Sequence, residues 1–514
     1  MPDETLPPPL NQTPRTRRRQ SALWGVLLLL CSSYVDMLLG LIEVIYVMNR
    51  IGPLGKGLMA LVDIFNKWLS NAHLGTLHGV SKQLPMALGR KDEARAQELE
   101  DVGVTAVLGL GLLGSLGMLA WALLGPRLGG TTREVLAIGA GLVWCGHTFN
   151  IYRIVLRSWG TFTVIAMASV VTTVVEFGLE IVGAYYFGVV GATLGWLGAN
   201  LAQLLYLHYH SRLRIRLRWN WPMVRYLIRT GLPLTAIVFS DVLLLTVDSL
   251  VVLRLLKAYN LGLYWVAASV AGYVKKIPES AGFVLMPRIW EKFGAKNGEV
   301  HALRDEVVTP TLAAATVMPV LSGLLFMIIP GALALVVPKF VPAAFAAQVL
   351  CMGGAFLALP LAANGLLVAM NREFQVVLCK LPGAAVIAAG SYWTLTHGGG
   401  LGQVAMCAVL GYALSSALLL TAALRHFYPQ PLRLAQELAI CHLPFLWALG
   451  ALKAAGLLAR LLGATPRTWS EVLLRMALFL LLCVPMLWYG NLRTGVLSRL
   501  RLLLREKLAR PGAD

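Results

Sequence analysis

The chain has 514 residues, of which 57% are hydrophobic and only 13% are charged, and its mean hydropathy is +0.70. Soluble domains carry about 25% charged residues, so this composition excludes an ordinary soluble globule. The formal net charge of +19 is compatible with nucleic acid, an anionic membrane surface or an acidic substrate, and the positions of the charges decide among them.

Apolar segments long enough to cross a bilayer as helices, about 20 residues each, recur from Ala22 almost to the end of the chain. The tail of residues 1–21 is rich in proline and contains a group of arginines. The apolar stretch after it is too long for the apolar region of a signal peptide, so we expect it to be retained as the first span. Charged and turn-rich breaks then predict about fourteen transmembrane helices, near 22–48, 56–80, 101–124, 134–156, 160–187, 189–210, 227–256, 261–286, 307–329, 343–370, 373–396, 400–424, 436–460 and 470–491.

Lysine and arginine concentrate in alternate connections between these spans. One set of connections, which includes both termini, holds 26 of them, and the other set holds 9. Short cytoplasmic loops are the ones enriched in Lys and Arg, so both termini are predicted to be cytoplasmic. The basic excess is thereby assigned to topology and to anchoring at the lipid surface, and we expect membrane lipids rather than nucleic acid as partners.

The sequence also contains an internal repeat. A shift of 205 residues places Asp36 on Asp241 and the first predicted span on the seventh. The same shift places Glu43 on Asp248. In each span the two carboxylates are seven residues apart, which puts them on one face of a helix. A repeat of six spans preserves orientation in the membrane, as in transporters built from two parallel bundles.

We therefore expect an all-α polytopic membrane protein with two six-helix lobes, related by a pseudo-two-fold axis along the membrane normal, and two additional C-terminal helices. The predicted division is a basic cytoplasmic tail (1–21), an N-lobe (22–210), a basic cytoplasmic linker (211–226), a C-lobe (227–424), the last two spans (436–491) and a basic amphipathic cytoplasmic tail (492–514).

Charged residues inside predicted spans need a polar environment, because each costs about 2.5–3.5 kcal/mol at mid-bilayer. We expect them to face a central cavity rather than lipid. Asp63 and Lys67 are spaced i,i+4, as are Lys275 and Glu279, so each of these pairs could also serve only to neutralise itself. The charged residues concerned are Asp36, Glu43, Asp63, Lys67, Glu176, Glu180, Asp241, Asp248, Lys275, Lys276, Glu279 and Lys380.

The adjacent pair Lys275 and Lys276 is the most distinctive of these features. Neighbouring side chains point about 100° apart on a helix, so Glu279 neutralises one lysine more readily than the other. Pro278 distorts the helix beside them, as expected where backbone lines a cavity. Surplus positive charge in such a cavity favours an anion, and phosphate or pyrophosphate is the anion that lysines commonly bind.

Motifs of enzymes are not found. The chain has no Walker A, HExxH or GxSxG pattern, and the GxGxxG match at 109–114 lies inside a predicted span, where small residues serve helix packing. The seven cysteines are scattered through apolar stretches. We therefore expect neither an enzyme nor a resident cofactor or metal, and any uphill transport would draw on Na⁺, on H⁺ or on later consumption of the product.

Four segments resemble the polysaccharide flippases of the O-antigen type, within the multidrug/oligosaccharidyl-lipid/polysaccharide exporter superfamily. They are VMNRIGPLGKG (47–57), LGRKDEARA (88–96), LIRTGLPLTAIVFSDVLLLTVD (227–248) and LGLYWVAASVAGYVKKIPESAGFVLMPRIW (261–290). The resemblance implies two six-helix lobes around a central cavity and alternating access. It also implies translocation of an undecaprenyl-pyrophosphate-linked oligosaccharide across the bacterial cytoplasmic membrane, together with polysaccharide polymerase and glycosyltransferases as further partners.

Two relatives in the superfamily remain as alternatives. Lipid II flippases use arginines in their first two spans, whereas here the first span carries Asp36 and Glu43. Multidrug antiporters resemble the chain in having carboxylates that bind Na⁺ or H⁺, but organic cations do not suit Lys275 and Lys276. The predicted pyrophosphate-binding cations are Lys275, Lys276, Lys67 and, near the outer rim, Arg50; the carboxylates predicted for ion coupling or charge balance are Asp36, Glu43, Asp63, Asp241, Asp248 and Glu279.

Overall fold

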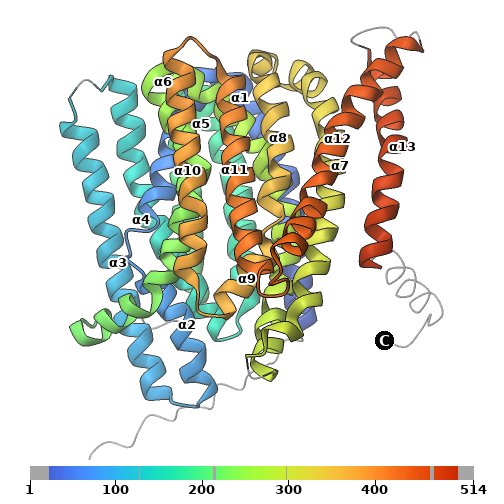
Figure 1. Ribbon diagram of the computed structural model, residues 1–514. Coiled ribbons are helices and arrows are strands. Elements are labelled where there is room, and N and C mark those ends of the chain that lie inside the picture. The colour runs from blue at the N-terminus through green and yellow to red at the C-terminus, as the bar shows by residue number, and fades with distance from the viewer. Residues whose placement is uncertain (1–21, 127, 212–215, 297, 463–467, 496–514) are drawn as a thin grey trace, which may run out of the picture.

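The computed structural model describes residues 22–126, 128–211, 216–296, 298–462 and 468–495, without the side chains of 22–38, 277, 281, 283 and 284. All regular elements in these ranges are helical, and most run side by side (Figure 1). They are α1 (Ala22–Leu69), α2 (Thr76–Gly89), α3 (Glu93–Leu124), α4 (Gly130–Ser158), α5 (Phe162–His210), α6 (Trp221–Ala295), η1 (Val300–Leu303), α7 (Arg304–Val336), η2 (Pro338–Ala343), α8 (Ala344–Ala358), α9 (Leu361–Ala369), α10 (Glu373–Thr396), α11 (Leu401–Leu424), α12 (Pro431–Leu461) and α13 (Trp469–Thr494).

Ten helical segments in the described ranges are long and apolar enough to cross a membrane. Two of them, α5 and α6, fold back on themselves, and counting their halves separately gives twelve candidate spans. The chain is thus an all-helical polytopic membrane protein. The predicted count of about fourteen includes two further spans, 22–48 on α1 and 56–80, which begins on α1 and ends on α2. Neither α1 nor α2 is among the ten segments, and the count of fourteen stays a prediction.

The reversal within α6 follows from a hydrogen bond. Tyr264 Oη donates to Asp248 Oδ2 at 2.7 Å, although 16 residues would span about 24 Å along a straight helix. The turn is at Lys257, where φ is 67° and ψ is −179°. Gly52 in α1 has nearly the same conformation, with φ 67° and ψ −174°. These two positions are 205 residues apart, which is the offset of the sequence repeat.

The helices next to these two turns contact each other reciprocally. A Cβ on Gly57 would collide with the backbone carbonyl of Ala258, and a Cβ on Gly262 would collide with that of Pro53. The offset of 205 relates Pro53 to Ala258 and Gly57 to Gly262. Gly57 therefore contacts the repeat equivalent of Pro53, and Gly262, the repeat equivalent of Gly57, contacts Pro53 itself. Such reciprocity is typical of an isologous two-fold contact. Glycine is required here because the two backbones touch.

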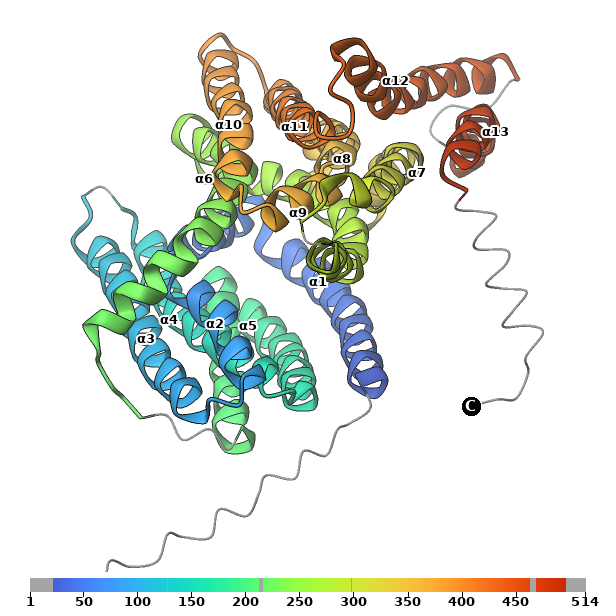
Figure 2. The same ribbon diagram turned by 60° about the horizontal axis from the view of Figure 1, so that its bottom comes forward.

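The helices form two groups, seen from below in Figure 2. The N-terminal half comprises α1–α5, and α2–α5 pack around one apolar core, into which the beginning of α6 also inserts through Met223, Val224 and Leu227. The C-terminal half comprises the rest of α6 and α7–α11. The last two helices, α12 and α13, pack mainly on α7, where Gly323 leaves room for the ring of Phe479.

The two halves also touch near the turns of α1 and α6. Asn49 Nδ2 donates to the carbonyl of Val336 at 2.7 Å, and Lys339 Nζ donates to the carbonyl of Asn49 at 2.7 Å. The connection of α10 to α11 lies at the top of Figure 1 and the basic connection of α2 to α3 at the bottom. In the predicted topology, the contacts through Asn49 lie on the outer side, opposite the basic loops.

Candidate functional site

A pocket lies in the C-terminal half, between α6, α8, α10 and α11. Leu244, Leu245, Phe356 and other apolar residues form part of its wall. Its polar lining residues are Asp241 and Lys275 from α6, Lys380 from α10, and Tyr412, Ser415 and Ser416 from α11. This C-half pocket therefore brings two lysines, one carboxylate and three hydroxyls together inside a membrane-spanning bundle.

Lys380 is the most buried cation of this pocket. Its side chain is 5% exposed, and Nζ forms an ion pair with Asp241 Oδ1 at 2.8 Å. Among the described residues the ammonium has no hydrogen-bond acceptor besides this carboxylate, and Ser416 Oγ has no partner either. An ammonium has three donors, so the pocket presents unused donors to whatever enters it.

The two adjacent lysines of α6 point in different directions, as their helical spacing predicts. Lys275 lines the C-half pocket and forms an ion pair with Glu279 at 2.9 Å. Lys276 is exposed, and its ammonium lies 5.2 Å from the ring centroid of Tyr273, outside the pocket lining. The structure thus brings Lys275 together with Lys380 rather than with its neighbour.

A second pocket lies in the N-terminal half, between the second half of α1, α4 and the second half of α5. Its polar lining residues are Asn66, Lys67, Ser70, His147, Asn150, Trp196 and Asn200. Lys67 pairs with Asp63 at 2.7 Å, and Asp63 also accepts a hydrogen bond at 3.3 Å from Trp265 of the other half. This N-half pocket is therefore mostly neutral and rich in amides.

The two pockets occupy corresponding places in the repeat. The N-half pocket takes its walls from the second, fourth and sixth predicted spans, and the C-half pocket takes walls from the eighth, tenth and twelfth. The C-half pocket adds Asp241 from the seventh span and Lys380 from the eleventh. Equivalent positions in the two halves thus carry different chemistry.

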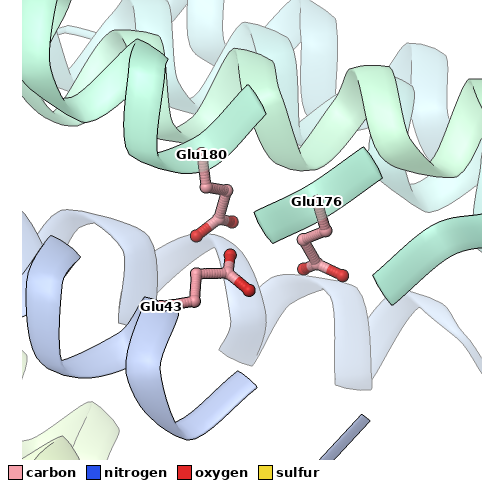
Figure 3. Close-up of side chains that lie close together, drawn as sticks. All are labelled: Glu43, Glu176 and Glu180. Carbon is pink, nitrogen blue, oxygen red and sulfur yellow. The ribbon is translucent and has the colours of Figure 1, made fainter. Parts of the chain in front are cut away.

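A cluster of three glutamates lies in the N-terminal half, and Figure 3 shows their side chains turned toward one another. Glu43 comes from α1, and Glu176 and Glu180 come from the first half of α5; one carboxylate oxygen of each lies within 4.8 Å of the others. Glu43 is 5% exposed and Glu180 is 7% exposed. Carboxylates this close repel one another when ionised, so the cluster can hold a proton or a metal cation.

Lys56 is another buried cation of the N-terminal half. Its side chain is buried, and Nζ lies 4.5 Å from the ring centroid of Trp265 in α6. This contact joins the two halves just beyond the turn at Gly52.

The other predicted site residues have separate positions. Asp248 is 1% exposed and accepts hydrogen bonds from Tyr264 and from the backbone N–H of Ser249, so its charge is satisfied within α6. Arg50, next to the turn of α1, donates to the carbonyl of Tyr185 at 2.9 Å. The side chain of Asp36 lies outside the described part of the structure.

Sequence reasoning identified Lys380 as an intramembrane charge but not as a site residue, although a single lysine in the apolar stretch 373–396 is a usable signal. It also left out Arg153, which is exposed on α4 and donates to Asn150 of the N-half pocket at 3.1 Å. Arg153 lies within the predicted span 134–156, so the cost of a charge in lipid could have identified it.

Comparison with known proteins gives a match to one family model over part of the chain. Residues 84–327 match a family model described as "Polysaccharide biosynthesis protein". No curated protein matches the chain in sequence.

Several solved structures share the fold. A multidrug resistance MATE family transporter of the MOP superfamily, in an inward-facing conformation, has a TM-score of 0.64 at 15% identity, covering 78% of this chain and 95% of that one. The lipid II flippase MurJ, in an inward closed conformation, has a TM-score of 0.63 at 12% identity, covering 92% and 100%. A MOP superfamily transporter from Pyrococcus furiosus has a TM-score of 0.58 at 16% identity, covering 81% and 96%. At these identities the similarity establishes a MATE-like fold and not a cargo.

Proposed function

We propose, from the match of residues 84–327 to the polysaccharide biosynthesis protein model and from the MATE-like fold, that the chain moves a lipid-linked oligosaccharide across a membrane. The cargo is an undecaprenyl-pyrophosphate-linked oligosaccharide, the repeat unit of a polysaccharide. The membrane is the bacterial cytoplasmic membrane, and both termini are cytoplasmic. Glycosyltransferases supply the cargo, and a polymerase consumes it on the other side.

The observation that carries this proposal is that two cations, Lys275 and Lys380, line the same pocket. A diphosphate needs cations and hydroxyl donors, and charge-assisted hydrogen bonds in a pocket of lowered dielectric are stronger than in water. Lys380 retains unused donors beside Asp241, and Ser416 retains an unused hydroxyl. The polyprenyl tail remains in lipid while the charged headgroup occupies the pocket.

Alternating access is the mechanism that fits two lobes. The lobes comprise six helices each, within 22–210 and 227–424, and a pseudo-two-fold axis along the membrane normal relates them. The reciprocal contact of Gly57 and Gly262 supports this axis. The contacts of Asn49 with Val336 and Lys339 hold the outer side together, so cargo enters from the side of the basic loops and leaves when these contacts open.

An ion gradient is the proposed source of energy, since the sequence carries no nucleotide-binding motif. Coupling requires a group whose occupancy differs between the two conformations. Glu43, Glu176 and Glu180 form such a group in the N-terminal half, with Asp36 on the same helix as Glu43. Asp241 is the candidate in the C-half pocket, where its pair with Lys380 links ion occupancy to the cargo site.

The proposal is tested with a matched pair of neighbouring substitutions. Lys275→Gln removes a pocket cation, and Lys276→Gln removes the exposed cation beside it. In proteoliposomes loaded with a fluorescent undecaprenyl-pyrophosphate-linked oligosaccharide, we expect Lys275→Gln to slow flipping at least about tenfold, since a charge-assisted bond contributes about 1.5–3 kcal/mol. Lys276→Gln should retain most of the activity, whereas equal losses would assign the anion site to both lysines.

The same vesicles separate the alternatives. A wild-type protein that moves lipid II but not the oligosaccharide lipid would be a lipid II flippase, and one that moves only an organic cation such as ethidium would be a multidrug antiporter. Either result would overturn the proposal. We expect neither, because the C-half pocket is lined by two lysines and a single carboxylate and so disfavours a cationic cargo.

A further inference from the structure

The N-half pocket differs from its counterpart in that most of its polar groups are uncharged. Three asparagines, a serine, a histidine and a tryptophan line it. Its one cation, Lys67, pairs with Asp63 at 2.7 Å, so this lining carries one cation where the C-half pocket carries two. Asn66 Oδ1 is buried and has no hydrogen-bond partner among the described residues. The pocket thus offers hydrogen-bonding capacity without net charge.

Sugars match this lining chemically. Each amide provides both a donor and an acceptor, and each sugar hydroxyl does the same, so neither partner is left with an unpaired group. The indole of Trp196 adds an apolar face and an N–H donor in the same wall. An ionised diphosphate, in contrast, has acceptors but no donors. It would leave the carbonyl oxygens of the asparagine side chains without a hydrogen-bond partner. An apolar drug would leave all of these groups unpaired at a free-energy cost.

The two pockets have lining residues at about the same distance along their helices from the turns of α1 and α6. Lys67 is 15 residues from the turn at Gly52 and Asp241 is 16 residues from the turn at Lys257, about 22 and 24 Å along their helices. Residues that follow the two linings in the sequence contact each other, since Trp68 Nε1 donates to Thr246 Oγ1 at 2.9 Å. Trp68 is the next residue in the sequence after Asn66 and Lys67, which line the N-half pocket. Thr246 is the next residue after Leu244 and Leu245, which line the C-half pocket.

We infer that the N-half pocket is a sugar-binding subsite, which holds a saccharide of the oligosaccharide while the C-half pocket holds the diphosphate. This inference rests on the proposed function. One headgroup then bridges the two halves, and the repeat has diverged so that equivalent pockets recognise the two chemically different parts of a single ligand.

A filled pocket tests the inference. Gly146 lines the N-half pocket, and a Cβ added there meets no atom within 4 Å, so Gly146→Leu fills the pocket without a backbone clash. Gly117→Leu is the matched control, because Gly117 is an exposed helical glycine of α3 whose added Cβ also meets nothing. A second variant, Asn150→Ala, removes one amide from the lining without adding volume.

Binding is measured in detergent with two probes, the oligosaccharide-linked undecaprenyl pyrophosphate and undecaprenyl pyrophosphate without sugar. We expect Gly146→Leu and Asn150→Ala to weaken binding of the first probe about tenfold or more while binding of the second stays within about twofold. Gly117→Leu should bind both like the wild type, and Lys275→Gln should weaken both.

Equal weakening of both probes by the pocket variants, or no effect on either, would overturn the sugar assignment and leave the proposed function standing. A wild-type protein that bound neither probe would overturn the proposed function and the sugar assignment together.

Discussion

Lys380 and Asp241 illustrate how a buried charge is maintained in a membrane protein. The two residues lie 139 positions apart, on α10 and α6, and form an ion pair at 2.8 Å with the lysine 95% shielded. Only the lysine is buried, since the Asp241 side chain is 41% exposed, so removing the aspartate is the costly change: it leaves a desolvated ammonium without its partner. Removing both is much less costly.

We predict that Asp241→Asn lowers the stability of the protein by about 1.5–3 kcal/mol, the contribution of a charge-assisted bond, and that adding Lys380→Gln restores most of it. Thermal unfolding in detergent measures both variants. The double variant should nevertheless fail to flip the cargo, because its pocket has lost a cation. Equal melting temperatures for the single and double variants would show that the pair does not act as a unit.

The three-glutamate cluster makes a second prediction at the scale of residues. Since the carboxylates of Glu43, Glu176 and Glu180 approach within 4.8 Å, the number of protons or cations that they hold should change when the surrounding helices move. Flipping in proteoliposomes should therefore respond to an imposed Na⁺ or pH gradient, and Glu180→Gln should abolish that response. Glu134→Gln, an exposed carboxylate on α4, is the control.

Flipping that ignores both gradients in the wild-type protein would contradict ion coupling while leaving the flippase assignment intact. A response that persists in Glu180→Gln would exclude the cluster as the coupling site and favour Asp241.

Among the elements, the two helical hairpins of α1 and α6 have the same turn geometry but not the same residue. Gly52 and Lys257 both adopt φ 67° with ψ near 180°, a region that is costly for any residue except glycine, by about 1–3 kcal/mol. Lys257 is exposed, so its side chain offers little to offset that cost.

We expect Lys257→Gly to raise stability by about 1 kcal/mol or more, because it removes this strain and loses no buried contact. Arg254→Gly is the matched control, since Arg254 is exposed in the regular part of the same helix and glycine there should lower stability by about 1 kcal/mol. Thermal unfolding in detergent measures the two changes in stability, a rise for Lys257→Gly and a fall for Arg254→Gly. Destabilisation by Lys257→Gly would mean that the turn is not strained.

For the whole molecule, the decisive contact is the one between the two halves near the turns. Gly57 and Gly262 let the backbones of α1 and α6 touch, and each would clash with the carbonyl of Ala258 or Pro53 if it carried a side chain. The close contact of the two halves near these turns thus depends on the absence of two side chains.

We predict that Gly57→Val pushes the halves apart on the outer side and slows flipping, and that Gly262→Val does the same because the contact is reciprocal. Spin labels on the two hairpin turns should report a longer distance in both variants. Gly40→Val, on the same helix as Gly57 but with no atom within 4 Å of the added Cβ, should leave the distance unchanged. Unchanged distances in the Gly57 and Gly262 variants would contradict a closed outer side.

The sequence by itself determined that the protein is an all-helical polytopic membrane protein, and residues 84–327 match the model of a polysaccharide biosynthesis protein family. Apolar run length, basic loops and local motifs carry this information, and all of them depend on residues close together in the chain. The offset of 205 residues, found from matching carboxylates, also relates Gly52 to Lys257, whose matching backbone conformations only the structure shows. Local helical spacing correctly separated Lys275 from Lys276 and paired Lys275 with Glu279.

Only the tertiary structure decided which distant charges meet. Lys275 lies near Lys380 in one pocket, and Glu43 lies near Glu180, because packed helices bring together side chains that are more than 100 residues apart. Helical periodicity fixes the face on which a residue lies, but the neighbour of that face depends on how ridges and small residues of two helices fit. The chemistry of the two pockets is therefore a property of the packed bundle and could not be predicted from any single span.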